Sequence, residues 1–257
     1  MEKTLSSFFR KDRISTGIKE LDIALEGGYQ NPGAIIILSS TIQEKLAFAL
    51  HFTQAGINRG EKVAYIAFDL SPDEIEKKAD AFGMDFKTHV GKELIFIDAY
   101  SHTIRVKPAD RNKDISIPGP GAFNDLSLAL NDIIRQSEEA DGTKGIEESK
   151  GILGTERTEG KRIRVIFHSL STLSLYSQLD VITKFLHVIQ GKLKTANATS
   201  LWLLDEGACD KKFISILESI SDQKLVISDK GGAYELNVTN IPIPLSMKIG
   251  AAGIEIL

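Results

Sequence analysis

The chain has 257 residues, of which 42% are hydrophobic and 26% charged, which is the composition of an ordinary globular protein with a sizeable core. A formal charge of -4 excludes a strongly basic nucleic-acid-binding protein, and the single cysteine, Cys209, excludes an intrachain disulfide. The first residues lack the apolar stretch of a secretion signal, and no apolar run reaches the roughly 18 residues of a membrane-spanning helix. These features predict a cytoplasmic protein.

Strand-like and helix-like segments alternate along the chain, which is typical of a mostly parallel sheet covered by helices. An α/β domain is therefore predicted. The predicted strands are Ala34–Leu38, Val63–Phe68, Leu94–Ile97, Arg164–Phe167, Ser200–Leu204 and Lys224–Ser228, and the predicted helices cover about 45–58, 72–82, 122–140, 179–195 and 210–220.

Turn-forming residues add detail at two places. Ser71, the following proline and Glu74 form the pattern of a capping box, and Gly83 marks the end of that helix. Residues 229–232 read as a tight turn into a strand at 233–238, so we expect an antiparallel extension of the sheet towards the C-terminus.

Two segments lack a regular pattern. Residues 138–161 are rich in Gly, Glu, Lys and Thr and predict a long mobile loop, and residues 107–121 predict an irregular but stiffer one. The basic cluster at 161–164 is interpreted as the solvated start of a strand. The predicted organisation is an N-terminal tail, 1–12, and a single domain, 13–257.

The segment 39–46, S-S-T-I-Q-E-K-L, lies between a predicted strand and a predicted helix, which is the context of a Walker A loop, G-x-x-x-x-G-K-[ST]. Ser39 and Glu44 occupy the two glycine positions, Lys45 is retained, and Leu46 occupies the Ser/Thr position. Each non-glycine residue forced into a left-handed conformation costs roughly 1–2 kcal/mol, and Glu44 adds negative charge beside a polyanion. The sequence predicts a loop without its phosphate site, although weak nucleotide or anion binding at Lys45 stays an open alternative.

Residues 13–28, R-I-S-T-G-I-K-E-L-D-I-A-L-E-G-G, are similar to the opening "STGI-x-x-LD-x-x-L-x-GG" of the RecA-like ATPase superfamily, most closely its KaiC and archaeal RadA-like branch. The match continues through residues 32–66, and residues 164–171, R-V-I-F-H-S-L-S, resemble the Walker B strand. The resemblance implies a RecA-like (P-loop NTPase-type) three-layer domain with a mostly parallel central sheet and an antiparallel C-terminal extension.

Several positions depart from that family. Ile42 stands where its members usually have a third loop glycine, and Leu46 lacks the hydroxyl that would bind Mg²⁺. His168 replaces the Walker B aspartate, and Asp69-Leu70 stand where the family has a pair of glutamates. The resemblance therefore implies a pseudo-ATPase that acts as a protein-binding or regulatory module, with no catalytic residue, cofactor or metal expected.

Two other functions stay open. Asp69, Asp98, His168, Asp205 and Glu206 all follow predicted parallel strands, at the edge where open α/β sheets place their sites. They could serve a hydrolytic or metal-dependent enzyme, or they could simply cap turns. An accessory DNA-recombination protein is a third alternative, for which fold analogy is the only support.

Phe8 and Phe9 are two large apolar residues in an otherwise polar tail. They could pack on their own domain, or dock on a neighbouring subunit as RadA-like proteins do with a Phe-containing segment. The expected partner is a protein or peptide, either a second copy or an active RecA-like relative. A membrane or nucleic-acid partner is not expected.

Overall fold

The computed structural model describes residues 12–40, 42–105, 114–140, 162–231, 233–250 and 253–257. Within them, ten strands form one sheet in the order β12-β11-β10-β9-β3-β8-β7-β4-β5-β6, and two short strands form a separate pair. The strands are β1 (Arg13–Ile14), β2 (Tyr29–Gln30), β3 (Gly33–Ser39), β4 (Lys62–Ala67), β5 (Leu94–Asp98), β6 (Ile115–Ser116), β7 (Ile163–His168), β8 (Ala198–Asp205), β9 (Gln223–Asp229), β10 (Tyr234–Val238), β11 (Leu245–Gly250) and β12 (Gly253–Ile256).

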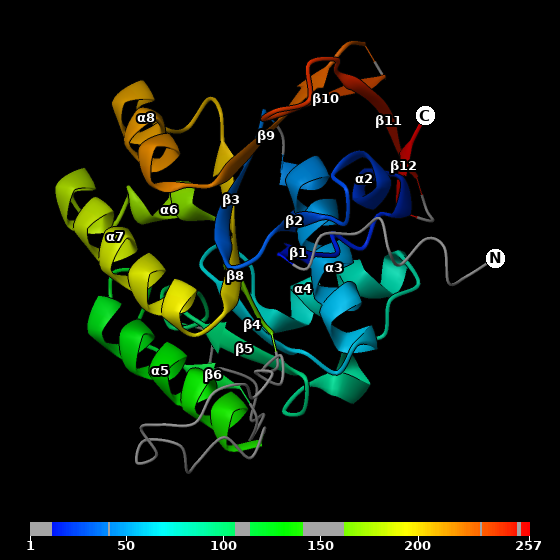
Figure 1. Ribbon diagram of the computed structural model, residues 1–257. Coiled ribbons are helices and arrows are strands. Elements are labelled where there is room, and N and C mark those ends of the chain that lie inside the picture. The colour runs from blue at the N-terminus through cyan, green and yellow to red at the C-terminus, as the bar shows by residue number, and fades with distance from the viewer. Residues whose placement is uncertain (1–11, 41, 106–113, 141–161, 232, 251–252) are drawn as a thin grey trace, which may run out of the picture.

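Helices cover both faces of this sheet, so each face has its own apolar core (Figure 1). None of the helices in the described ranges combines the length and apolar character needed to cross a bilayer. One face carries α2 (Lys19–Ala24), α3 (Ile42–Asn58) and α4 (Pro72–Ala81), the other carries α5 (Phe123–Ala140), α6 (Leu170–Leu173), α7 (Leu179–Thr195) and α8 (Lys211–Ile220), and a short 3₁₀ turn, η1 (Lys87–His89), precedes β5.

The predicted α/β fold is confirmed. Strands β9, β3, β8, β7, β4, β5 and β6 are parallel, whereas β9 to β12 pair antiparallel. The turn after β9 is closed by a hydrogen bond from Lys230 N to Ala233 O of 2.8 Å, as the glycine-containing sequence there predicts. The capping box is also confirmed, since Ser71 and Glu74 bond reciprocally at the start of α4.

Two boundaries differ from the prediction. Helix α5 continues to Ala140, so residues 138–140 belong to the helix instead of the loop, and the rest of that loop, 141–161, lies outside the described residues. The segment predicted to be irregular contributes the short strand β6, which ends beside the buried Ile117. The predicted tail, including both of its phenylalanines, lies outside the described residues apart from residue 12.

The opening motif folds into a turn that fixes α2. The Asp22 carboxylate accepts hydrogen bonds from Thr16 N (2.6 Å), Thr16 Oγ1 (2.7 Å) and Ser15 Oγ (2.5 Å). Gly17 has φ +88°, and a Cβ there would lie 2.2 Å from the carbonyl oxygen of His51 on α3. The Ser-Thr-Gly and Leu-Asp parts of the motif therefore hold this turn in close contact with α3.

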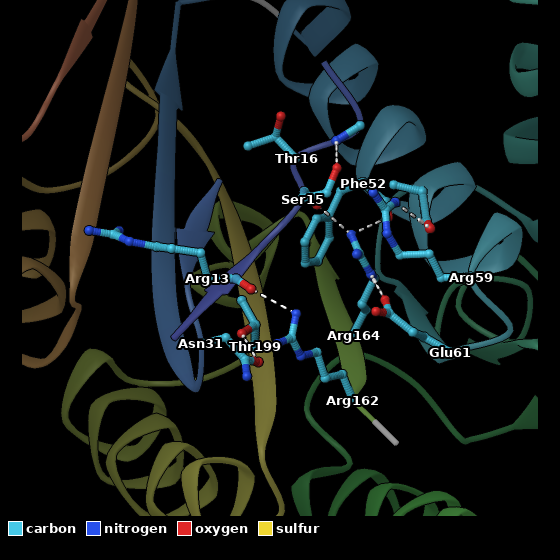
Figure 2. Close-up of polar contacts among 12 residues, drawn as sticks. Arg13, Ser15, Thr16, Asn31, Phe52, Arg59, Glu61, Arg162, Arg164 and Thr199 are labelled. Atoms are coloured by element: carbon cyan, nitrogen blue, oxygen red, sulfur yellow. Dashed lines mark hydrogen bonds and ion pairs between the residues drawn. The ribbon is translucent and has the colours of Figure 1, made fainter. Parts of the chain in front are cut away.

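The interpretation of residues 161–164 as solvated is wrong for Arg164, which is fully buried on β7. Its Nε donates to Glu61 Oε2 at 2.5 Å, and its Nη1 donates to the carbonyl oxygens of Ser15 (2.8 Å) and Phe52 (2.9 Å), as Figure 2 shows. The guanidinium also lies 4.3 Å from the centre of the Phe52 ring. Since a buried charge must be paired, this side chain joins β7 to the opening turn, to α3 and to the start of β4.

Substituting Arg164→Met should lower the free energy of unfolding by about 3–5 kcal/mol, because the buried Glu61 carboxylate then loses its cation. Chemical denaturation of the double variant Arg164→Met/Glu61→Gln should recover part of that loss. The control is Arg135→Met on α5, whose ion pairs with Asp132 and Glu139 are exposed and should contribute little to stability. Equal effects of the two single substitutions would contradict the role given to Arg164.

Candidate functional site

The candidate site lies where the parallel strands end, the edge at which open α/β sheets bind their ligands. In the strand register Ser39, the last residue of β3, pairs with Asp205, the last residue of β8. On the other side of β8, His168 at the end of β7 pairs with Ala67 at the end of β4. Asp69 follows β4 two residues later. The structure thus brings together three of the acid and histidine positions that the sequence singled out.

Lys45, on the first turn of α3, is the cation of this cluster. Its side chain has no exposed surface, and its ammonium forms an ion pair with the carboxylate of Asp205, whose side chain is 22% exposed. The other oxygen of that carboxylate accepts a hydrogen bond from Ser169 Oγ at 3.3 Å. The residue that a Walker A loop directs at phosphate is here bound to an internal carboxylate.

The turn before α3 is short. Strand β3 ends at Ser39 and the helix begins at Ile42, so Glu44 is already helical and earlier than the helix start predicted at 45. Glu44 is buried and accepts a hydrogen bond from Ser39 Oγ at 3.1 Å, while Leu46 belongs to the apolar core beneath the helix.

His168 is fully buried beside Tyr65 of β4. The Tyr65 hydroxyl lies 3.1 Å from His168 Nδ1, and the two rings meet edge to face. On the other side, His168 Nε2 lies 3.9 Å from Asp69 Oδ1, and neither of these two buried atoms has a hydrogen-bond partner among the described residues. The imidazole is therefore oriented by the tyrosine and faces the aspartate.

Burial sets the protonation of this pair. Desolvation, assisted by the Lys45 ammonium, lowers the pKa of His168 to about 3, so the imidazole is neutral at pH 7. Desolvation raises the pKa of Asp69 to about 6; the Lys45 ammonium opposes this rise and the Asp205 carboxylate adds to it. At neutral pH the imidazole of His168 is thus uncharged. Asp69 is still mostly ionised, because its pKa of about 6 lies below 7.

The two remaining acids of the predicted edge cluster have other surroundings. Asp98 Oδ1 accepts hydrogen bonds from the backbone N–H groups of Tyr100 (3.0 Å) and Ser101 (2.9 Å), so it caps the turn after β5. Glu206 is exposed. Within the described ranges no group of three or more His, Cys, Asp or Glu residues is arranged to hold a metal ion. Turn capping is the role that the structure supports for Asp98.

Sequence reasoning missed the polar residues that surround Asp205. Ser171 Oγ accepts from Asp205 N at 2.7 Å and lies 3.1 Å from Cys209 Sγ, and Ser169 bonds the carboxylate itself. The sequence signal for the two serines is the serine-rich end of the segment 164–171 that resembles a Walker B strand. Tyr65 is a buried core residue whose hydroxyl also orients His168.

With this geometry in view, the fold and the site define an α/β domain of the KaiC-like ATPase type. A solved KaiC-like protein from the hyperthermophilic archaeon Pyrococcus horikoshii superposes with a TM-score of 0.66 at 15% identity, covering 95% of this chain and 98% of that one. At this identity the likeness shows the fold. The family model for the KaiC ATPases matches residues 14–236, so the chain belongs to the KaiC family.

Relatives by sequence include the circadian clock protein KaiC2 of Synechocystis, 33% identical over 90 residues, and a UPF0273 protein of Methanopyrus kandleri, 28% identical over 91 residues. Each match covers 35% of this chain. The matched stretch spans 16% of the Synechocystis protein and 36% of the archaeal one.

Substituting Lys45→Met should lower the free energy of unfolding by about 2–3 kcal/mol, because it leaves the Asp205 carboxylate half-enclosed without its cation. In an ATPase whose loop lysine has no partner until phosphate binds, the same substitution would hardly change the free energy of unfolding of the ligand-free protein. Thermal and urea unfolding measure the effect, and Lys45→Met/Asp205→Asn should recover part of it. Lys87→Met, which removes an exposed ion pair with Asp80, is the control. A Lys45 variant as stable as the wild type would show that this ion pair contributes nothing.

Proposed function

We propose that this KaiC family member does not hydrolyse ATP and acts as a protein-binding or regulatory module. One observation carries the proposal: the Lys45 ammonium, which would have to meet the phosphates of a nucleotide, is buried and paired with Asp205. A triphosphate would have to displace that carboxylate and expose it to like charge, which is costly in a partly buried site.

The geometry of the preceding turn supports the same conclusion. A phosphate-binding loop needs several successive backbone N–H groups pointing at the anion, and glycines provide the required conformations. Here the helix starts at Ile42, so the N–H groups of a longer loop are not presented. Glu44, at the position of the second glycine, adds a carboxylate, and Leu46 is buried in the core.

The Walker B side offers no substitute for the missing hydroxyl. A magnesium ion prefers oxygen ligands, and His168 supplies a buried neutral imidazole held by Tyr65 instead. Asp69 contributes one carboxylate beside this imidazole, with Oδ1 3.9 Å from His168 Nε2, and Leu46 supplies no hydroxyl to complete a magnesium site. Both features support a domain that retained the KaiC scaffold without nucleotide chemistry.

Isothermal titration of the full chain with Mg-ATP should give no saturable binding up to about 1 mM, a range in which a working site would already be filled. Submicromolar binding, or nucleotide enclosed by residues 39–46 in a crystal, would overturn the proposal. The matched measurement omits Mg²⁺, because an anion held by Lys45 alone would bind equally with and without the metal.

Repair of the loop gives the complementary test. The variant Ser39→Gly, Ile42→Gly, Glu44→Gly and Leu46→Thr should gain measurable nucleotide affinity, because it regains backbone freedom and loses the repelling charge. Hydrolysis should stay negligible, because His168 still stands at the Walker B position. If the repaired protein binds no better than the wild type, the rest of the pocket is also closed.

The proposed partner is a protein or peptide, either a second copy or an active relative, and the proposed contact is made by Phe8 and Phe9. Replacing both with Ala should weaken self-association or partner binding by roughly 2–4 kcal/mol or more, because buried aromatics dominate such interfaces. Sedimentation of both proteins at several concentrations, with and without ATP, measures the effect. A monomer at every concentration, together with unchanged partner binding by the variant, would remove the tail from the proposal.

A further inference from the structure

A pocket of about 430 Å³ lies on the outer face of α3, away from the strand edge. The opening turn and α2 form one wall, and the C-terminal half of α3 forms the other, with Ile23 and Ala55 among the lining residues. The volume falls within the roughly 300–1,000 Å³ of ordinary ligand pockets. Since α3 rises 1.5 Å per residue, the lining residues of this helix lie from about 9 Å (His51) to about 20 Å (Asn58) along it from Lys45. The pocket is thus separate from the candidate nucleotide site.

The acidic and basic residues of this pocket differ in whether they already have partners within the chain. Its one carboxylate, Asp22, already accepts three hydrogen bonds from Ser15 and Thr16. Its two cations, Lys19 and Arg59, have no ion-pair partner among the residues that the structure describes. The pocket therefore has a carboxylate that is already hydrogen-bonded and two cations without an ion pair among the described residues.

Arg59 is also held in position. Its Nη1 donates to the carbonyl oxygen of Ala55, one turn earlier on α3, at 3.1 Å, which keeps the guanidinium folded back along the helix beside the pocket. Figure 2 shows Arg59 and Ser15 on either side of the buried Arg164. Burial lowers the pKa of Arg164 and the charge of Arg59 adds a smaller lowering, so an anion at the pocket would offset that repulsion.

His51 adds no charge to the pocket. Its Nε2 accepts a hydrogen bond from the backbone N–H of Ile254 at 3.1 Å, and burial lowers its pKa, so the ring is neutral at pH 7. His51 thus leaves Lys19 and Arg59 as the groups that select the charge of a ligand.

One polar atom in the pocket lacks a partner. Gln54 Nε2 donates to Asn58 Oδ1 at 2.7 Å, which leaves the buried Gln54 Oε1 without a donor among the described residues. Gln54 lines the pocket, so a turn of its amide towards a ligand carrying an N–H or O–H group would satisfy this acceptor and recover the free energy of the missing hydrogen bond. The volume of about 430 Å³ is larger than a bare inorganic ion needs, and Ile23 and Ala55 give the pocket an apolar part.

From these observations we infer that this pocket binds a small organic anion, with the carboxylate or phosphate head at Lys19 and Arg59, a hydrogen-bond donor facing Gln54, and an apolar body between α2 and α3. This site goes beyond the proposed function, since it uses no residue of the strand edge and requires neither nucleotide nor partner protein.

The test is an NMR titration of the ¹⁵N-labelled full chain with three probes: 4-hydroxybenzoate, phenyl phosphate and the neutral 4-hydroxybenzamide. At least one anion should give saturable shifts in the backbone amides of residues 15–23 and 51–59, and the neutral amide should bind roughly 10-fold more weakly or worse. The stronger of the two anions identifies the head group.

Variants locate the site. Lys19→Ala/Arg59→Ala should weaken the anion by roughly 10-fold or more, whereas the control Lys211→Ala/Lys212→Ala on α8 should leave it unchanged. Gln54→Leu should weaken 4-hydroxybenzoate and spare phenyl phosphate, which has no donor on its ring. The inference is overturned if no probe saturates up to about 10 mM, a concentration above the Kd of even a weak fragment. It is also overturned if the shifts persist in the first double variant or fall at the strand edge instead.

Discussion

The buried guanidinium of Arg164 is the interaction on which the arrangement of this domain depends. Its burial removes one charge from water, and the contacts with Glu61, with two backbone carbonyls and with the face of Phe52 offset the loss of hydration. Those partners belong to the start of β4, the opening turn and α3. The guanidinium also requires Gly56, because a Cβ there would lie 2.7 Å from Arg164 Cδ. These contacts therefore fix where α3 packs on the sheet.

The same helix is held at its other end by a second buried ion pair. Lys45 on the first turn bonds Asp205 of β8, while the C-terminal half of the helix contacts Arg164 of β7. In a nucleotide-binding P-loop protein the first turn of this helix and the loop before it receive the phosphates. Here an internal carboxylate meets that ammonium, and Ser39 meets Glu44. Contacts within the chain therefore stabilise this edge.

Local patterns allowed the sequence to predict much of the fold. The apolar strands, the capping box at Ser71 and Glu74, and the turn after β9 each depend on neighbouring residues, and all three are confirmed. The pairing of Lys45 with Asp205 joins residues 160 positions apart, and the burial of Arg164 depends on how α3 packs on β7. Basic residues at the start of a strand are usually solvated, so composition favoured the wrong interpretation of Arg164. Contacts between residues far apart in the sequence decided both cases.

The cations on and around α3 differ in how strongly an incoming anion would have to compete for them. The ammonium of Lys45 and the guanidinium of Arg164 each have a carboxylate partner within the chain, so an incoming anion must compete with an acid already in place. Lys19 and Arg59 have none among the described residues, and the carboxylate of Asp22, which lines the pocket with them, is occupied by the opening turn. The cation of the strand edge, Lys45, is thus paired within the chain, whereas Lys19 and Arg59 on the outer face of α3 have no ion pair among the described residues. An anion at the first place must displace an acid, whereas at the proposed pocket it would meet cations without such a competitor.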